Sequence, residues 1–208
     1  MLAAGLRRNR ALHVVAAVAF AATLGIAPSQ ATPSATSQGA GSAGATRVVA
    51  SSPVIGRRYE IVNRYHFDNR ACLDAFASGG GVAGNRVGLF RCTGGVTQKW
   101  RVYRNPESDA YPFKFVNEVN SLLCLTENGM GAPYTLEVCS PGSTRQSFTT
   151  QAALPAGSGT YILWVNDPVG DGDILADAFG SECCRDGMSV GNWWFTGSAL
   201  QKWDFVQS

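Results

Sequence analysis

The sequence predicts an all-β domain that is built from three copies of one structural unit. The main evidence is an internal repeat with a spacing of 103 positions. The tripeptide Asp-Ala-Phe occurs at 74–76 and again at 177–179, and the tripeptide Gln-Lys-Trp occurs at 98–100 and again at 201–203. Further residues between these tripeptides match at the same spacing without a gap, which indicates a duplicated unit. Short β-branched and aromatic runs also alternate with Gly, Asn, Asp and Pro clusters, as strands alternate with turns, and the domain shows no helical periodicity.

A third, altered copy lies between these two. Its motifs are Cys124–Thr126, Leu136–Cys139 and Gln146–Phe148, in the places of Cys72–Asp74, Leu89–Cys92 and Gln98–Trp100. The aromatic ends of the units fall at positions 100, 148 and 203, so one unit is about 50 residues long. Because a unit of this length cannot bury its apolar face alone, we expect the three units to close around one core.

The first 31 residues have the pattern of a secretory signal peptide. Three arginines come before an apolar run from Ala11 to Ala27, and small residues at Ser29 and Ala31 follow it. A membrane anchor is the alternative, although the run is near the lower length limit for a bilayer span. The Arg7–Arg8 pair also allows a twin-arginine signal, but the residues after it match that signal poorly.

The rest of the chain divides into a linker and one domain. Residues 32–55 are rich in Thr, Ser, Gly and Ala and carry a single charge, so they are predicted to form a flexible linker. Residues 56–208 are enough for one core and too few for two ordinary domains. We therefore expect a secreted, extracellular monomer without membrane contact after processing.

Charge and residue chemistry exclude several classes of function. Without Arg7, Arg8 and Arg10, 14 basic residues stand against 15 acidic ones, so no basic block remains to bind nucleic acid. The mature chain has one histidine, His66, and no nucleophile motif beside it. Chain order identifies no pair of carboxylates for glycoside hydrolysis, and no Cys or His spacing fits a metal site. The sequence thus predicts a protein that is not an enzyme and has no cofactor and no metal.

The three units resemble the ricin B-type lectin family. Each unit ends in Gln-x-aromatic, and the first opens with Cys-Leu-Asp. The resemblance extends from about Tyr59 to Val206 and implies a β-trefoil, a fold with pseudo-threefold symmetry. It also implies that the glutamines link strands and that the aromatic residues pack in a common core. Structural core roles are therefore expected for Gln98, Trp100, Gln146, Phe148, Gln201 and Trp203.

All six cysteines lie in the mature part of the chain, which indicates disulfides in an oxidising compartment. Counting alone allows fifteen pairings. The family resemblance implies one bridge inside each of the first two units, Cys72–Cys92 and Cys124–Cys139.

The third unit differs at the positions of these bridges. It has Leu175 and Phe195 there, apolar residues that can fill the space of a disulfide. Cys183 and Cys184 have no counterpart in the other units. A bridge between neighbours would be strained and reducible, and we favour the alternative that these two cysteines fix a loop without a catalytic role.

The resemblance also implies carbohydrate-binding residues in the first and third units. In lectins of this family a carboxylate accepts hydrogen bonds from sugar hydroxyls, and an aromatic ring stacks on the apolar face of the pyranose. The matching residues here are Asp74 with Phe90 and Asp177 with Trp193. A local shift would make Trp194 the platform in the third unit.

Other parts of the family pattern are missing. A glutamine and an asparagine of the family sites are replaced by Gly88 and Thr97 in the first unit and by Gly191 and Leu200 in the third. The middle unit has Thr126 and Glu137 at the positions of the aspartate and the ring, so we expect it to be structural.

The predicted function is that of a secreted, non-catalytic, lectin-like module for galactose- or xylose-type glycans. One carboxylate and one ring give millimolar affinity at best, so weak, multivalent binding to a polysaccharide is expected. The missing glutamines and asparagines leave an alternative, a degenerate β-trefoil that serves as a protein-binding or inhibitory scaffold without sugar binding.

Overall fold

The computed structural model describes residues 52–65, 70–77, 80–153, 160–166, 174–179 and 185–208. The predicted signal peptide, nearly all of the predicted linker, His66 and the Cys183–Cys184 pair lie outside the described residues. In the described part of the chain, no helix has the length and apolar character needed to cross a membrane.

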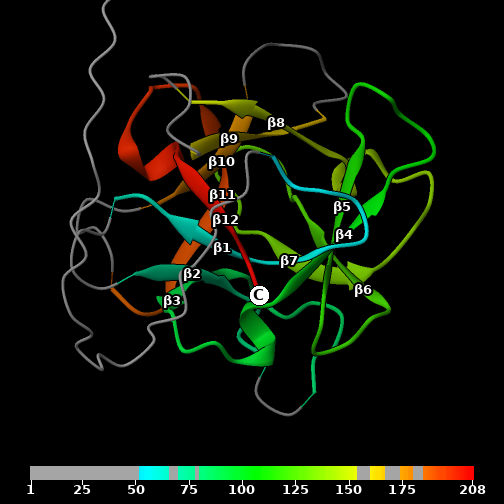
Figure 1. Ribbon diagram of the computed structural model, residues 1–208, viewed down its shortest axis with the longest axis horizontal. Coiled ribbons are helices and arrows are strands. Elements are labelled where there is room, and N and C mark those ends of the chain that lie inside the picture. The colour runs from blue at the N-terminus through cyan, green and yellow to red at the C-terminus, as the bar shows by residue number, and fades with distance from the viewer. Residues whose placement is uncertain (1–51, 66–69, 78–79, 154–159, 167–173, 180–184) are drawn as a thin grey trace, which may run out of the picture. The chain divides into compact units, whose positions relative to one another are not determined.

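The described residues form twelve β-strands and three short 3-10 turns (Figure 1). The strands are β1 (Arg58–Asn63), β2 (Ala71–Asp74), β3 (Gly88–Arg91), β4 (Trp100–Arg104), β5 (Phe113–Asn117), β6 (Leu123–Thr126), β7 (Thr135–Val138), β8 (Phe148–Ala152), β9 (Thr160–Val165), β10 (Ile174–Ala178), β11 (Met188–Trp194) and β12 (Trp203–Gln207). The turns are η1 (Val96–Gln98), η2 (Thr144–Gln146) and η3 (Ala199–Gln201). Each Gln-x-aromatic tripeptide therefore joins the end of a 3-10 turn to the start of a strand.

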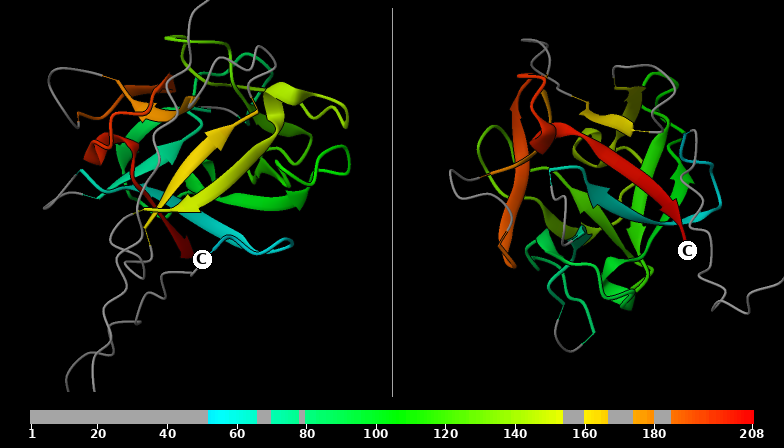
Figure 2. Two further views of the ribbon diagram at one scale, coloured as in Figure 1. Left: turned by 90° about the horizontal axis from the view of Figure 1, so that it is seen from above. Right: turned by 60° about the vertical axis from the view of Figure 1, so that its left-hand side comes forward.

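Six of the strands close into a barrel. β1 pairs with β12 and β4, β4 with β5, β5 with β8, β8 with β9, and β9 with β12, all antiparallel. Closure leaves no unpaired edge between these strands. In the right-hand view of Figure 2 the red β12 runs beside the cyan β1, so the first and last described strands are neighbours.

Three β-hairpins complete the fold, one in each unit. They are β2–β3, β6–β7 and β10–β11. The first strand of each hairpin pairs with the barrel strand before it, as β1–β2, β5–β6 and β9–β10. The same arrangement of barrel strands and hairpin thus occurs three times, and this confirms the predicted all-β, pseudo-threefold β-trefoil.

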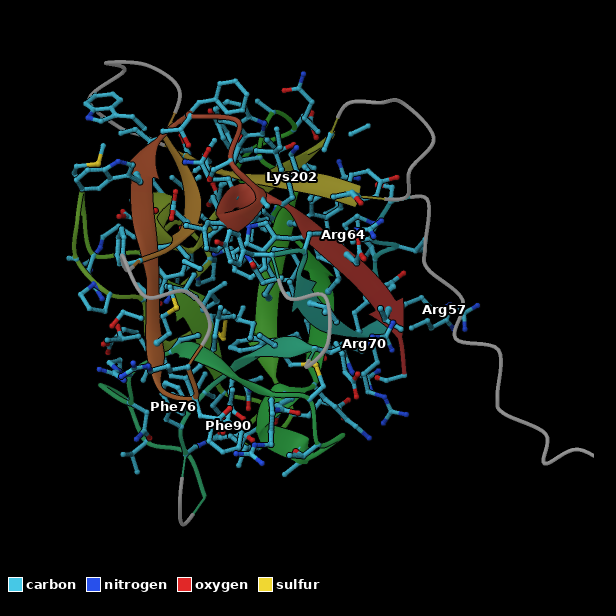
Figure 3. All side chains as sticks on the ribbon, turned by 90° about the vertical axis from the view of Figure 1, so that its left-hand side faces the viewer. Arg57, Arg64, Arg70, Phe76, Phe90 and Lys202 are labelled. Atoms are coloured by element: carbon cyan, nitrogen blue, oxygen red, sulfur yellow. A yellow bond between two sulfur atoms is a disulfide. The ribbon has the colours of Figure 1, made fainter. Side chains whose placement is uncertain are left out.

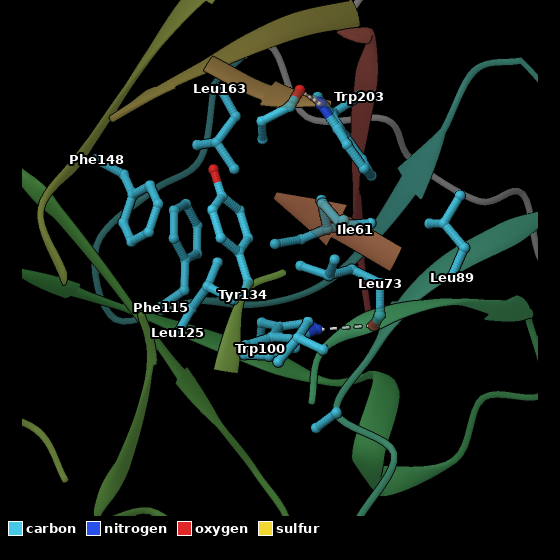
Figure 4. Close-up of a cluster of buried hydrophobic side chains, with 14 of the residues drawn as sticks. Ile61, Leu73, Leu89, Trp100, Phe115, Leu125, Tyr134, Phe148, Leu163 and Trp203 are labelled. Carbon is cyan, nitrogen blue, oxygen red and sulfur yellow. Dashed lines mark hydrogen bonds between the residues drawn. The ribbon is translucent and has the colours of Figure 1, made fainter. Parts of the chain in front are cut away.

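The core collects apolar side chains from all three units (Figure 4). Trp100, Phe148 and Trp203 are fully buried in one cluster. The indole N–H of Trp100 donates to the Leu73 carbonyl at 2.9 Å, and that of Trp203 donates to the Ala176 carbonyl at 3.1 Å. These bonds satisfy donors that would otherwise destabilise a buried position.

Candidate functional site

The three glutamines of the tripeptides hold each hairpin to the turn that follows it. The side-chain N–H groups of Gln98, Gln146 and Gln201 donate to backbone carbonyls at the ends of β3, β7 and β11, at 2.8, 3.0 and 2.7 Å. Their side-chain oxygens accept from backbone N–H groups just after those strands. Because all three glutamines are buried, these paired amides fix the position of the hairpin that carries each candidate site.

In the first unit the carboxylate of Asp74 is used by the protein itself. Asp74 ends β2, lies opposite Gly88 of β3 and is buried. Its Oδ1 accepts from the backbone N–H of Phe76 at 2.8 Å, and its Oδ2 accepts from the hydroxyl of Thr97 at 3.3 Å. Thr97 thus occupies the position of the missing asparagine and binds the aspartate within the fold.

The space beside Asp74 is filled by the ring of Phe76. This residue has a φ of 39°, which is rare for a side chain of this size, and the bond to Asp74 stabilises the turn that requires it. A β-carbon at Gly88 would lie 2.6 Å from the ring and would clash with the Met188 carbonyl. A glutamine at position 88 therefore has no room.

The aromatic candidate of the first unit is Phe90. It lies on β3 opposite Cys72 and is half-buried. The Arg91 guanidinium lies 5.8 Å from the centre of its ring. Figure 3 shows Phe76 and Phe90 at the same end of the molecule. The structure thus brings Asp74 and Phe90 onto one hairpin, but both oxygens of the carboxylate already accept hydrogen bonds.

In the third unit one carboxylate oxygen of Asp177 has no hydrogen-bond partner among the described residues, although Asp177 is as buried as Asp74. Asp177 lies on β10 opposite Gly191 of β11. Its Oδ2 accepts from the Gln201 amide at 2.6 Å, whereas its Oδ1 accepts no hydrogen bond from the described residues. Burial raises the pKa of Asp177 above its ordinary value, and the bond from Gln201 opposes this shift. The third unit cannot reproduce the bond from Thr97, because Leu200 stands at that position.

Trp193 lies on the same face of this hairpin as Asp177. Opposite residues of an antiparallel pair share a face, and residues two apart along a strand do too; Asp177 faces Gly191, and Trp193 follows two positions later. The Trp193 side chain is 43% exposed, and the edge of the Phe179 ring meets it with 5.9 Å between the ring centres. Phe179 also packs on Gly191, as Phe76 packs on Gly88. An exposed ring and a carboxylate oxygen without a partner among the described residues therefore lie on one face of this hairpin.

The other tryptophan, Trp194, points the opposite way. It lies opposite Ile174, which packs against the core side of the sheet, and it is 45% exposed. It is therefore on the other face of the hairpin from Asp177.

The middle unit holds neither part of a sugar site. The Thr126 hydroxyl donates to the Cys124 carbonyl at 3.0 Å and accepts from Gln146. Glu137 lies on β7 opposite Cys124 and accepts from the Thr135 hydroxyl at 3.0 Å. These contacts agree with a structural role.

A buried polar cluster joins the middle and third units. The Tyr134 hydroxyl donates to the Asn192 side-chain oxygen at 2.6 Å, and the Asn192 amide donates to Glu127 at 2.8 Å. Burial, together with the nearby Glu127 and Asp177 carboxylates, raises the pKa of Tyr134 well above its ordinary value. The only sequence signal for this cluster is Asn192 itself, a polar residue at a position where the other units have leucine.

The described cysteines form the two bridges that the family resemblance implies. Cys72 is bonded to Cys92, and Cys124 to Cys139. In the third unit Leu175 is fully buried at the corresponding place, whereas Phe195 is 47% exposed. Phe195 therefore leaves the space of the second cysteine partly open.

Comparisons with known proteins give structural relatives alone: no family model matches the chain, and no curated protein matches it in sequence. The designed 3-fold symmetric protein ThreeFoil is 22% identical with a TM-score of 0.57, over 72% of this chain and 97% of ThreeFoil. The β-trefoil lectin of the Vibrio vulnificus hemolysin/cytolysin, solved with N-acetyl-D-lactosamine bound, is 20% identical with a TM-score of 0.52, over 73% and 96% of the two chains. The Macrolepiota procera ricin B-like lectin, in complex with lactose, is 16% identical with a TM-score of 0.52, over 73% and 96%. At these identities the likeness establishes the fold, and the chain is a β-trefoil with the architecture of ricin B-like lectins.

Proposed function

We propose that this protein is a secreted, non-catalytic carbohydrate-binding module. The observation that carries the proposal is that Asp177 and Trp193 lie on one face of the β10–β11 hairpin. A free carboxylate oxygen can accept a sugar hydroxyl, and an exposed indole can cover the apolar face of a pyranose. Structural relatives solved with lactose and with N-acetyl-D-lactosamine support a galactose-type glycan as the first ligand to test.

The third unit is proposed as the stronger site and the first unit as the weaker one. Asp74 binds Phe76 and Thr97 through both oxygens, so a sugar would have to compete for them. Phe90 is also less exposed than Trp193. Asp74 and Phe90 are therefore expected to make a secondary contact.

Weak binding follows from the small number of contacts. A ring that covers about 50 Å² of sugar contributes about 1 kcal/mol, and a hydrogen bond to a carboxylate contributes about 1.5 to 3 kcal/mol. Association costs at least about 4 kcal/mol, so a site that makes two such hydrogen bonds binds in the millimolar range at best. Useful affinity then requires a polysaccharide that engages both units at once.

Binding of the purified protein to an array of galactose- and xylose-type glycans tests this proposal. We expect Trp193→Ala and Asp177→Ala to remove most of the binding without lowering the melting temperature by more than a few degrees. Trp194→Ala is the matched control, because Trp194 has the same exposure on the opposite face. If Trp194→Ala removes binding and Trp193→Ala does not, the platform has been assigned to the wrong tryptophan.

One observation favours a second candidate, a protein-binding or inhibitory scaffold. Phe76 and Phe179 fill the space over Gly88 and Gly191 in both units, so neither unit can hold the polar residue that assists sugar binding in the family. Absence of binding to every glycan on the array would favour the scaffold and overturn the lectin proposal.

A further inference from the structure

The third unit has a groove on its outer surface in addition to the Asp177–Trp193 face. The groove has a volume of about 500 Å³ and is lined by Gln151, Ala152, Ala153, Ile162, Trp164, Phe195, Gly197 and Lys202. Two rings form its aromatic part, because Trp164 and Phe195 lie 5.9 Å apart between centres at an angle of 38°. Phe195 is 47% exposed, so this ring is available to a ligand.

The groove differs from its counterpart in the middle unit because the third unit has other residues at equivalent positions. The equivalent positions follow from the strand register. The aromatic residues of the three tripeptides, Trp203, Trp100 and Phe148, pair with Asn63, Asn117 and Val165. The residues just before these partners, Val62, Val116 and Trp164, are therefore equivalent. In the same way Ile162 takes the place of Glu60 and Lys114, and Leu175 and Phe195 take the places of bridged cysteines. The corresponding pocket of the middle unit holds about 340 Å³ and is bounded by its disulfide and Lys114.

Trp164 packs against the buried cluster of Ala153, Ile162 and Leu175, but the described part of the fold does not satisfy its polar group. Its indole N–H is buried and has no hydrogen-bond partner in the described part of the chain, and an unsatisfied buried donor destabilises the folded state. The other two units have valine at this position. A ligand oxygen that reaches the indole after a small movement of the ring would satisfy the donor.

The groove lies on the same face of the sheet as Trp193, because Leu175 is the strand partner of both Trp193 and Trp164. Leu175 lies opposite Trp193 in the strand register, and it is buried in a cluster with Ile162 and Ala153 against which Trp164 packs. Phe195 follows Trp193 by two positions along the chain. A ligand that covers Trp193 therefore reaches the Trp164–Phe195 groove by extending along the same surface.

The polar residues at the groove favour an anionic ligand. Gln151 supplies an amide and Lys202 an ammonium group, and no acidic residue lines the groove. No ion pair involves Lys202 among the described residues. Figure 3 shows Lys202 well separated from Phe76 and Phe90, so its charge lies away from the candidate site of the first unit.

We propose that the Trp164–Phe195 groove is a second subsite that takes a uronic acid residue of the glycan bound at Trp193. This proposal rests on the proposed lectin function. The rings cover the apolar face of the pyranose, and Lys202 attracts its carboxylate. A uronic acid is the occupant because it combines a flat apolar face, oxygen acceptors and a negative charge in one residue.

The test compares oligosaccharides of the galactose and xylose types in two forms, neutral and with one uronic acid residue. Calorimetry on the purified protein should show tighter binding of the uronic acid form. Trp164→Val, which introduces the residue of the other units, should lower the affinity for the uronic acid form about fivefold. Lys202→Met should lower that affinity by up to about fivefold. The matched control is Lys99→Met, because Lys99 precedes Trp100 as Lys202 precedes Trp203; it should change nothing.

Each outcome separates this proposal from the proposed function. If neutral glycans bind through Trp193 but uronic acid brings no gain, or if Lys99→Met has the same effect as Lys202→Met, the subsite is overturned and the lectin function stands. If Trp164→Val abolishes capture of an acidic aromatic peptide instead, the groove binds protein and the uronic acid proposal is overturned. If no glycan of either form binds, both proposals are overturned.

Discussion

The first and third units start from the same tripeptides and use them differently. In the first unit the carboxylate of Asp74 stabilises the turn at Phe76, whereas in the third unit the backbone N–H of Phe179 donates to the Ser189 carbonyl. The Asp177 carboxylate therefore accepts no hydrogen bond from the Phe179 backbone N–H. The comparison shows that a repeated Asp-Ala-Phe sequence does not determine a repeated site, because the turn partner decides whether the carboxylate is available.

The two units also differ in what stabilises the hairpin. Cys72 and Cys92 form a covalent link in the first unit, and Leu175 packs with Ile162 and Ala153 in the third. The third unit thus has apolar packing in place of the bond between Cys72 and Cys92, and its Phe195 ring is 47% exposed.

The largest expected effect comes from removing the packing of the third unit. Leu175→Ala should lower the free energy of unfolding by about 3 kcal/mol, because a fully buried leucine leaves a cavity. Removing the first-unit bridge with Cys72→Ala and Cys92→Ala should cost a similar amount, about 3 kcal/mol. Urea unfolding measures both. A loss below about 1 kcal/mol for Leu175→Ala would show that packing does not replace the bridge.

An intermediate effect is expected from Asn192→Leu, which introduces the residue of the other two units. The substitution leaves Tyr134 and Glu127 without their buried partner, so it should cost about 2 kcal/mol. A double-mutant cycle with Tyr134→Phe provides the control. The double variant should lose less free energy of unfolding than the sum of the losses of the two single variants. Additive losses would mean that the cluster does not couple the units.

The smallest effect is a pH dependence that belongs to the third unit. Burial raises the pKa of Asp177, so its contribution to stability is fully present below the pKa of the unfolded chain and is lost as the pH rises through the folded value. Glycan binding requires the ionised carboxylate of Asp177. As the pH is lowered, binding should therefore weaken at a higher pH than the ordinary pKa of an aspartate would give. Asp177→Asn should remove this pH dependence of stability, and Asp74→Asn should leave it in place. Titration of unfolding and of binding against pH tests both statements.

The fold could be predicted because the repeat is visible in the chain. Gln98 and Gln201 recur with the aromatic residues that fill the core, and each aromatic residue begins a barrel strand. Such local patterns, repeated three times, specify a single architecture. The candidate aspartates and rings could also be located on their hairpins, because strand pairing follows from the same alignment.

The state of the sites could not be predicted from the sequence. The ring of Phe76 reaches Gly88 through a backbone angle that residue type does not reveal, and the approach of Met188 to Gly88 joins residues that are 100 positions apart in the sequence. The groove at Trp164 likewise depends on strands β8 and β9 lying beside the end of β11. Contacts between residues that are distant in the sequence decide these features, and the sequence motifs do not predict such contacts.

The pairing of β1 with β12 brings the two ends of the domain together. The backbone N–H of Ser208 donates to the Arg58 carbonyl at 3.2 Å, while Figures 2 and 3 place β11 on the far side of the molecule from the C-terminus. A surface, bead or fusion partner attached at the C-terminus would therefore not cover the face that carries Trp193. The protein can be immobilised by that end for sensor measurements with its proposed ligand face turned toward the solution.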